Sequence, residues 1–127
     1  MKSMMLFLLI ACCLGALRST AQTDSTQADR ILGRWTNEEK TRTIEFIKRD
    51  EVYEAFPVLP GSNQPDTKGR AVISGLRYDG KKYTGQAYAP KQNRQFACSI
   101  VLQGNDKMVL TGKVGFISQT RTWTRVK

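Results

Sequence analysis

The chain has 127 residues, enough for one domain, and its 20 basic residues outnumber 11 acidic ones to give a formal net charge of +9. It contains no histidine, which excludes Ser-His and Cys-His nucleophilic pairs and the commonest zinc sites.

The first 21 residues have the three-part layout of a secretory signal. Met1-Lys2 is a short positive start, residues 4–17 (MMLFLLIACCLGAL) carry no charge, and Ser19 and Ala21 are small. The uncharged run is too short to span a bilayer. We predict a signal peptide over residues 1–21 and an extracytoplasmic protein, periplasmic or secreted.

A second interpretation of this segment stays open. Residues 9–12 (LIAC) also match the lipobox of bacterial lipoproteins, in which the cysteine is lipidated and becomes the first mature residue. The apolar run continues past Cys13 to Leu17, which favours cleavage after Ala21. A membrane anchor through Cys12 is therefore the alternative, and it is the one membrane association that we expect.

Removal of residues 1–21 takes away Lys2, Arg18 and two of the three cysteines, leaving a formal net charge of +7. Because Cys98 is then alone, no disulfide forms within one chain. We divide the remainder into a polar segment over 22–30, with at most a short turn beginning at residue 24 or 25, and a β domain over 31–127.

Short β-rich runs follow, separated by turn residues. Apolar residues alternate with polar ones over residues 42–48, 51–59, 94–103 and 107–115, which marks half-buried strands. With the two tryptophans, the side chains that we expect to point inward are Trp35, Ile44, Phe46, Val52, Phe56, Phe96, Ile100, Leu102, Met108, Leu110 and Trp123.

The breaks between the runs have hairpin chemistry. Asp79-Gly80 predicts a type I′ turn, and weaker signals stand at 49–50, 90–93 and 104–106. The longest break is 60–69. Seven breaks give about eight strands, so we predict an all-β fold, an antiparallel up-and-down barrel or a sandwich.

The two tryptophans suggest how a barrel would close. A closed sheet has no exposed edges, but its first and last strands must pair. Trp35 lies on the first strand, and Trp123 lies on the last strand with Arg121 and Arg125 at same-face spacing. We predict that one of these arginines covers the Trp35 indole and closes the barrel through a cation–π contact.

At these residues the chain resembles two known groups. Gly33-Arg34-Trp35, with an arginine on the closing strand, resembles the signature of lipocalin-like barrels. Over residues 32–125 the chain is similar to the bacterial exported family known as domain of unknown function 2147, through LGRW, SNQPD…GR…SGL, YTGQAYAP…F, MVLTGKVG and TRTWTR.

The resemblance implies a small extracytoplasmic β-barrel of unassigned activity, and it carries over no catalytic residue. Ser118-Gln119 stand where the family usually has Gly-Arg, so the last turn is expected to differ in shape or charge. The positions that match the family pattern are Asn63, Pro65, Asp66, Arg70, Gly75, Gly85, Tyr88, Pro90, Gly112, Gly115, Trp123 and Arg125.

No cofactor, phosphate-loop or metal-ligand motif is present. Cys98 alternates with core residues and is expected to be an inert buried thiol. Glu45, Glu54 and Asp66 are the carboxylates that a glycoside hydrolase would need in pairs. We expect Glu45 in solvent and Glu54 inward, where a lone acid more often pairs with an arginine or bounds a ligand than catalyses. We therefore predict no catalytic site.

An eight-stranded barrel is either filled by its own side chains or holds one small molecule. If a cavity exists, Gly85 and Ala87 form its small-residue wall, loop 60–69 and Arg70 form its rim, and Glu54 and Asp66 are further candidate contacts.

Three functions follow, in this order. The first is a non-enzymatic barrel that binds a small apolar or amphipathic molecule in its lumen. The second is a packed envelope protein that meets an anionic partner through its basic surface or loop 60–69. The third is a carboxylate hydrolase. A secretory leader argues against nucleic acid as a partner.

Overall fold

The computed structural model describes residues 26–127. The predicted signal peptide, Cys12 and a turn beginning at residue 24 or 25 lie outside the described residues. Ile31–Lys127 form one compact unit.

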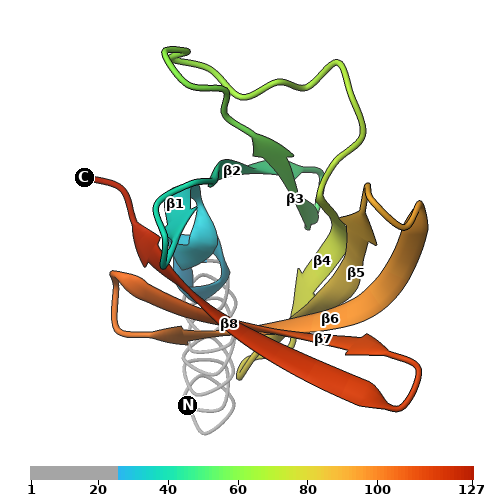
Figure 1. The fold of residues 1–127 in the computed structure, drawn as a ribbon. Helices are drawn as coiled ribbons and strands as arrows, with labels where there is room; N and C mark the ends of the chain where they lie inside the picture. The colour runs from blue at the N-terminus through green and yellow to red at the C-terminus, as the bar shows by residue number, and fades with distance from the viewer. Residues whose placement is uncertain (1–25) are drawn as a thin grey trace, which may run out of the picture. The chain divides into compact units, whose positions relative to one another are not determined.

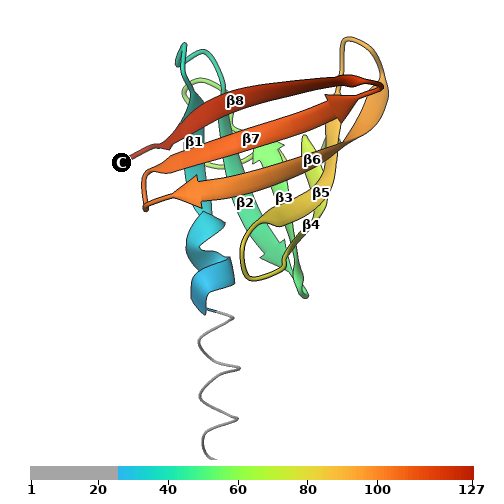
Figure 2. The same ribbon diagram turned by 90° about the horizontal axis from the view of Figure 1, so that it is seen from below.

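Within the described residues, eight antiparallel strands close into a barrel in chain order, and β8 pairs back with β1 (Figures 1 and 2). This confirms the predicted eight-stranded up-and-down barrel. A short 3-10 helix, η1 (Asp29–Ile31), comes before the strands, which are β1 (Gly33–Asn37), β2 (Thr43–Arg49), β3 (Val52–Pro57), β4 (Ile73–Tyr78), β5 (Tyr83–Ala89), β6 (Arg94–Gln103), β7 (Lys107–Val114) and β8 (Ile117–Arg125).

The connections alternate between the two ends of the barrel. Residues 50–51, 79–82 and 104–106 connect strands at the end where Ile31 enters β1, which we call the closed end. Residues 38–42, 58–72, 90–93 and 115–116 connect strands at the opposite end, which we call the open end.

The 79–82 hairpin forms by a route that the sequence did not predict. Of Asp79 and Gly80, Gly80 alone has a positive φ (100°), so the type I′ prediction is wrong although the hairpin is present. Oδ1 of Asp79 instead accepts the amide hydrogens of Lys81 and Lys82, each at 2.9 Å. These backbone bonds lower the pKa of Asp79. Because the Asp79 carboxylate accepts hydrogen bonds from the turn amides, the four-residue loop 79–82 is stabilised without two residues of positive φ.

The face of β3 that points inward was also predicted wrongly. Ala55 pairs with buried Phe46, so Tyr53 and Ala55 line the interior. Val52, Glu54 and Phe56 therefore lie on the outer face. Phe56 is nonetheless only 3% exposed, so β3 is covered on both faces and its apolar residues do not reveal which face is inside.

The core is densest at the closed end. Tyr53, Tyr83 and Met108 each stand at or next to the start of a strand that leaves this end, and all are buried. The rings of Tyr53 and Tyr83 meet edge to face with centroids 6.0 Å apart. The largest fully buried side chains are Ile31, Trp35, Tyr53, Leu76, Tyr83, Ile100 and Met108.

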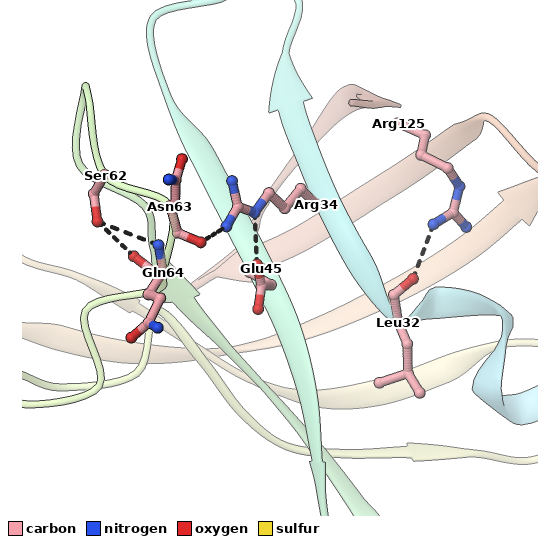
Figure 3. A network of polar contacts seen from close by, with 7 residues as sticks. All are labelled: Leu32, Arg34, Glu45, Ser62, Asn63, Gln64 and Arg125. Atoms are coloured by element: carbon pink, nitrogen blue, oxygen red, sulfur yellow. Dashed lines mark hydrogen bonds and ion pairs between the residues drawn. The ribbon is translucent and has the colours of Figure 1, made fainter. Parts of the chain in front are cut away.

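The predicted closure is present, and Arg125 makes it. Trp35 pairs with Arg125 across β1 and β8, and the guanidinium carbon lies 4.4 Å from the centroid of the fully buried indole. Nη1 of Arg125 donates to the Leu32 carbonyl at 2.9 Å (Figure 3), and Nε donates to the Asn105 carbonyl at 2.7 Å. The indole Nε1 donates to the Ile31 carbonyl at 2.9 Å. Arg125 thus ties β1 to the 104–106 hairpin.

Gly33 makes room for this arginine. Its φ is 118°, and a Cβ at this position would lie 2.9 Å from Nη1 of Arg125. The glycine two residues before Trp35 is therefore required by both the backbone conformation and the guanidinium beside it.

Arg125→Ala is expected to lower the free energy of unfolding by about 2–3 kcal/mol, because it removes the cation–π contact and two charge-assisted hydrogen bonds. Gly33→Ala is expected to cost about 1–3 kcal/mol through backbone strain and the clash with Nη1. Urea unfolding measures both. In the double variant the clash is gone, so the two losses must sum to less than additive.

Arg121→Ala is the matched control, since Arg121 lies on the same face of β8 but is exposed. It is expected to change stability by less than about 0.5 kcal/mol. An equal loss in Arg121→Ala and Arg125→Ala would contradict the closure.

Candidate functional site at the open end of the barrel

The loop 58–72 folds onto the outside of the barrel. Arg34 and Glu45 pair across β1 and β2 on the outer face, with Nε 2.6 Å from Oε1. Nη2 of Arg34 also donates to the Asn63 carbonyl (Figure 3). Glu45 in turn pairs with Phe56 across β2 and β3. The Asn63 carbonyl is thus held by Arg34 on the outer face of β1. On β3, the Arg49 guanidinium carbon lies 5.7 Å from the centroid of the Phe56 ring.

The predicted rim residues hold this loop in place. The Asp66 amide donates to the Pro57 carbonyl at 2.8 Å, and Oδ1 accepts the Lys68 amide at 3.2 Å. The guanidinium carbon of Arg70 lies 4.2 Å from the ring centroid of Tyr88. Tyr88 alternates with inward-facing Ala87, so Arg70 lies outside the barrel.

The predicted small-residue wall is close to neighbouring backbone and rings. A Cβ on Gly85 would lie 2.8 Å from the Ser74 carbonyl oxygen, because β4 has a register irregularity beside it. Ala87 is buried. A Cβ on Gly112 would lie 2.7 Å from the Phe96 ring. These small residues therefore admit close packing of β4 and of Phe96.

The inner face of the described strands carries basic side chains and no carboxylate. Lys48, Arg94, Arg121 and Arg125 all share the inward register of buried residues. The expectation that Glu54 points inward is wrong, because it pairs with Ile47 on the outer face, and its Oε1 lies 3.3 Å from Nε of Arg49. Glu45 is likewise outside, in the ion pair with Arg34.

Toward the open end the inner face becomes accessible. Phe96, Leu110 and Val114 lie on it and are half-buried, and Ile117 is 64% exposed. Arg121 pairs with Leu110 across β7 and β8 and is exposed, with one hydrogen bond to its neighbour's carbonyl at 3.3 Å. This half of the lumen thus combines apolar surface with a cation.

Trp123 lies two residues from Arg121 on the same inner face, opposite Met108. The residue is 9% exposed, and its Nε1 is buried without a hydrogen-bond acceptor among the described residues. A buried unpaired N–H costs about 1–3 kcal/mol. Sequence reasoning treated Trp123 and Arg121 as closure residues, because nothing in one strand reveals which donors lack acceptors.

Cys98 is buried on the inner face of β6, opposite Gly85 and Gly112. Burial raises the pKa of its thiol to about 11. Because the thiolate is the reactive form, the thiol is shielded both by burial and by protonation at neutral pH.

Residues 26–127 contain no cluster of three or more metal-ligating His, Cys, Asp or Glu side chains. In the same part of the chain, no helix has the length and apolarity to cross a membrane.

Residues 33–125 match the family model described as an uncharacterized protein conserved in bacteria, DUF2147. The chain belongs to the DUF2147 family. The match begins at Gly33 and ends at Arg125, the two residues that meet at the barrel closure, so the family domain is the barrel from its first strand to its last. The predicted membership is confirmed.

Among solved structures, this DUF2147 chain is similar to protein HP1028 from Helicobacter pylori, which is described as belonging to the lipocalin family. The TM-score is 0.59 at 20% identity, over 76% of this chain and 83% of the other. At this identity the likeness establishes the fold, a lipocalin-like barrel. No curated protein matches the chain.

Cys98 is expected to resist alkylation by iodoacetamide at pH 8 and to react fully in 6 M guanidinium chloride. With the pKa raised to about 11, the folded protein holds the thiol protonated at this pH. Mass spectrometry of the peptide that contains Cys98 measures the labelled fraction. Rapid labelling of the folded protein would contradict the burial and would identify a reactive thiol.

Proposed function

We propose that this lipocalin-like DUF2147 protein binds a small amphipathic acid in the open half of its lumen. The observation that carries the proposal is the pair formed by the unpaired indole N–H of Trp123 and the exposed guanidinium of Arg121, next to each other on the inner face. An acid placed there supplies oxygen atoms to a donor that has no acceptor and to a cation that has no carboxylate partner.

The charge of the lumen selects the headgroup. Because the inner face of the described strands is basic and lacks carboxylates, it favours an anion over a cation or a neutral molecule. Arg121 is placed to meet a carboxylate or phosphate, whereas Arg70 stacks on Tyr88 outside the barrel. Arg121 is therefore a better candidate than the predicted rim residue Arg70 for the contact with the headgroup.

The packing of the lumen limits the apolar part. The closed end is filled by fully buried side chains, including Tyr53, Leu76 and Tyr83. Toward the open end, the half-buried Phe96, Leu110 and Val114 offer the apolar surface that an alkyl chain would contact. The ligand that fits is short, with its acid at Arg121 and Trp123 and its chain toward Phe96 and Val114, which lie nearer the open end. An extracytoplasmic address, as the leader predicts, suits the capture of such an envelope-derived molecule.

Decanoate is expected to bind the wild-type protein, and Arg121→Gln is expected to weaken this binding about tenfold, which corresponds to the loss of one charge-assisted hydrogen bond. Decanol binding is expected to stay unchanged in the same variant, because the alcohol has no charge to lose. Trp123→Phe is expected to weaken both ligands. Isothermal titration calorimetry measures the four affinities.

Arg42→Gln is the matched control, since Arg42 is exposed on the 38–42 connection and loses the same charge. Equal weakening by Arg42→Gln would show a surface charge effect and would contradict the lumen site. Native mass spectrometry of the protein from its own host envelope provides the second check, and the result expected is a co-purified acid.

A second candidate is an envelope interaction protein, and the tip of the β7–β8 hairpin favours it. Phe116 is fully exposed and Ile117 is 64% exposed, which is unusual for large apolar residues at adjacent positions. Lys113 flanks them, paired with Ser118. This tip, rather than the loop 60–69, is the apolar surface that such a partner would meet.

If the tip docks on an anionic membrane surface, the protein is expected to sediment with phosphatidylglycerol vesicles, and Phe116→Ser is expected to lower the bound fraction at least threefold. Leu59→Ser removes another exposed apolar side chain and serves as the control. Equal sedimentation of wild type and Phe116→Ser would contradict this candidate and leave the lumen proposal untouched.

A further inference from the structure

A groove of about 470 Å³ lies on the outer face of β4–β7. Thr84, Ser99 and Thr111 form a continuous row across β5, β6 and β7, and each alternates with an inward-facing residue. The groove is therefore separated from the lumen by the sheet itself. Its volume falls within the range of small-ligand sites, about 300–1,000 Å³.

The floor and the walls of the groove differ in chemistry. Gly75, Gly85 and Ala97 contribute almost no side chain, so the floor is mainly backbone. The hydroxyls of Thr84, Ser99 and Thr111 stand along it. Thr111 shares a 3.3 Å contact with Thr120, and the row otherwise faces outward. Hydroxyl donors and acceptors over a flat floor suit a ligand that is rich in hydroxyl groups.

Cations stand on both sides of the row. Arg77 and Lys82 line the side of β4 and β5, and Lys113 lines the side of β7. No carboxylate lines the groove, and the side chains of Arg77 and Lys113 make no hydrogen bond or ion pair within the described residues. Lys82 faces Asp79, so Arg77 and Lys113 are the two cations whose charge is unmatched.

The separation of these cations sets the size of the ligand. β4 and β7 are three interstrand spacings apart, about 14 Å. At this backbone separation, an extended ligand can place one anionic group at each cation. A ligand with two anionic groups and a polar, uncharged stretch between them matches both sides.

We propose that this groove binds a segment of an anionic glycan, with its acidic groups at Arg77 and Lys113 and its sugar hydroxyls on the row Thr84, Ser99 and Thr111. A nucleic-acid strand fits less well, because the groove has no aromatic side chain on which bases could stack. A lipid surface fits less well, because no large apolar side chain lines the groove.

Tetragalacturonate, which carries a carboxylate on every sugar, is the probe. The protein is titrated with tetragalacturonate in 50 mM NaCl while its amide resonances are followed by NMR. The amide resonances of Thr84, Ser99 and Thr111 are expected to shift until the site is saturated. Arg77→Gln/Lys113→Gln is expected to weaken binding about five- to tenfold, as the loss of two exposed ion pairs predicts. Monogalacturonate, which reaches one side only, is expected to bind far more weakly than the tetramer.

Two matched variants separate this site from general charge attraction. Lys40→Gln/Arg42→Gln removes the same charge from the 38–42 connection and is expected to change the affinity less than twofold. Thr84→Val keeps the shape and removes one hydroxyl, so it is expected to weaken the binding of tetragalacturonate.

The proposal is overturned if both charge-removal pairs weaken binding equally, or if shifts appear away from the row. It is also overturned if a single-stranded oligonucleotide binds to the row at a lower concentration than tetragalacturonate does. None of these results bears on decanoate binding in the lumen, because the two sites lie on opposite faces of the sheet.

Discussion

The contact between Arg125 and Trp35 holds the two ends of the barrel sheet together, and most other features of the molecule depend on it. The guanidinium covers the indole at 4.4 Å and reaches two backbone carbonyls, one in front of β1 and one in the β6–β7 hairpin. Three separate parts of the chain are fixed by one side chain. A guanidinium stacked on a buried indole can also border a hydrophobic core, because its N–H groups can donate to nearby carbonyls. Gly33 permits this arrangement, because a Cβ at this position would lie only 2.9 Å from Nη1 of Arg125.

Closure at one end permits accessibility at the other. Because the closed end is filled by aromatic and aliphatic side chains, the open half can carry half-buried apolar residues and an exposed arginine at a tolerable cost in stability. The long loop 58–72 is attached to the outside of the barrel at two points. Arg34 hydrogen-bonds to Asn63 in segment 62–64, and Arg70 stacks against Tyr88. At these points the loop does not cover the open end of the barrel. The side chains at the family positions Asp66 and Arg70 are therefore explained by the structure and attachment of the loop, whereas Asn63 contributes its main-chain carbonyl.

Sequence reasoning succeeded where the chemistry is local. Turn residues at 50, 93 and 104 have the positive φ that their types suggest, and the period-two run over 94–103 coincides with β6. It failed for β3, because Phe56 is apolar and buried although it lies on the outer face, so the alternation of apolar residues points to the wrong side. It also could not place Arg70, whose position depends on the path of the loop 58–72. The outer groove was out of reach for a related reason: Thr84, Ser99 and Thr111 are unremarkable in their own strands, and only the register across three strands brings them into one row.

At the closure, Arg125 donates to the carbonyl of Leu32, a residue 93 positions earlier in the chain, and this has a consequence for the order of folding. A nascent chain that has not yet produced β8 cannot place the guanidinium over the indole, so the first strand has neither its cover nor one of its two neighbours. Until translation reaches the final strand, the polypeptide remains an open sheet with two unpaired margins. Such a chain cannot complete its tertiary packing during synthesis, and the barrel becomes rigid only after its last strand has been made.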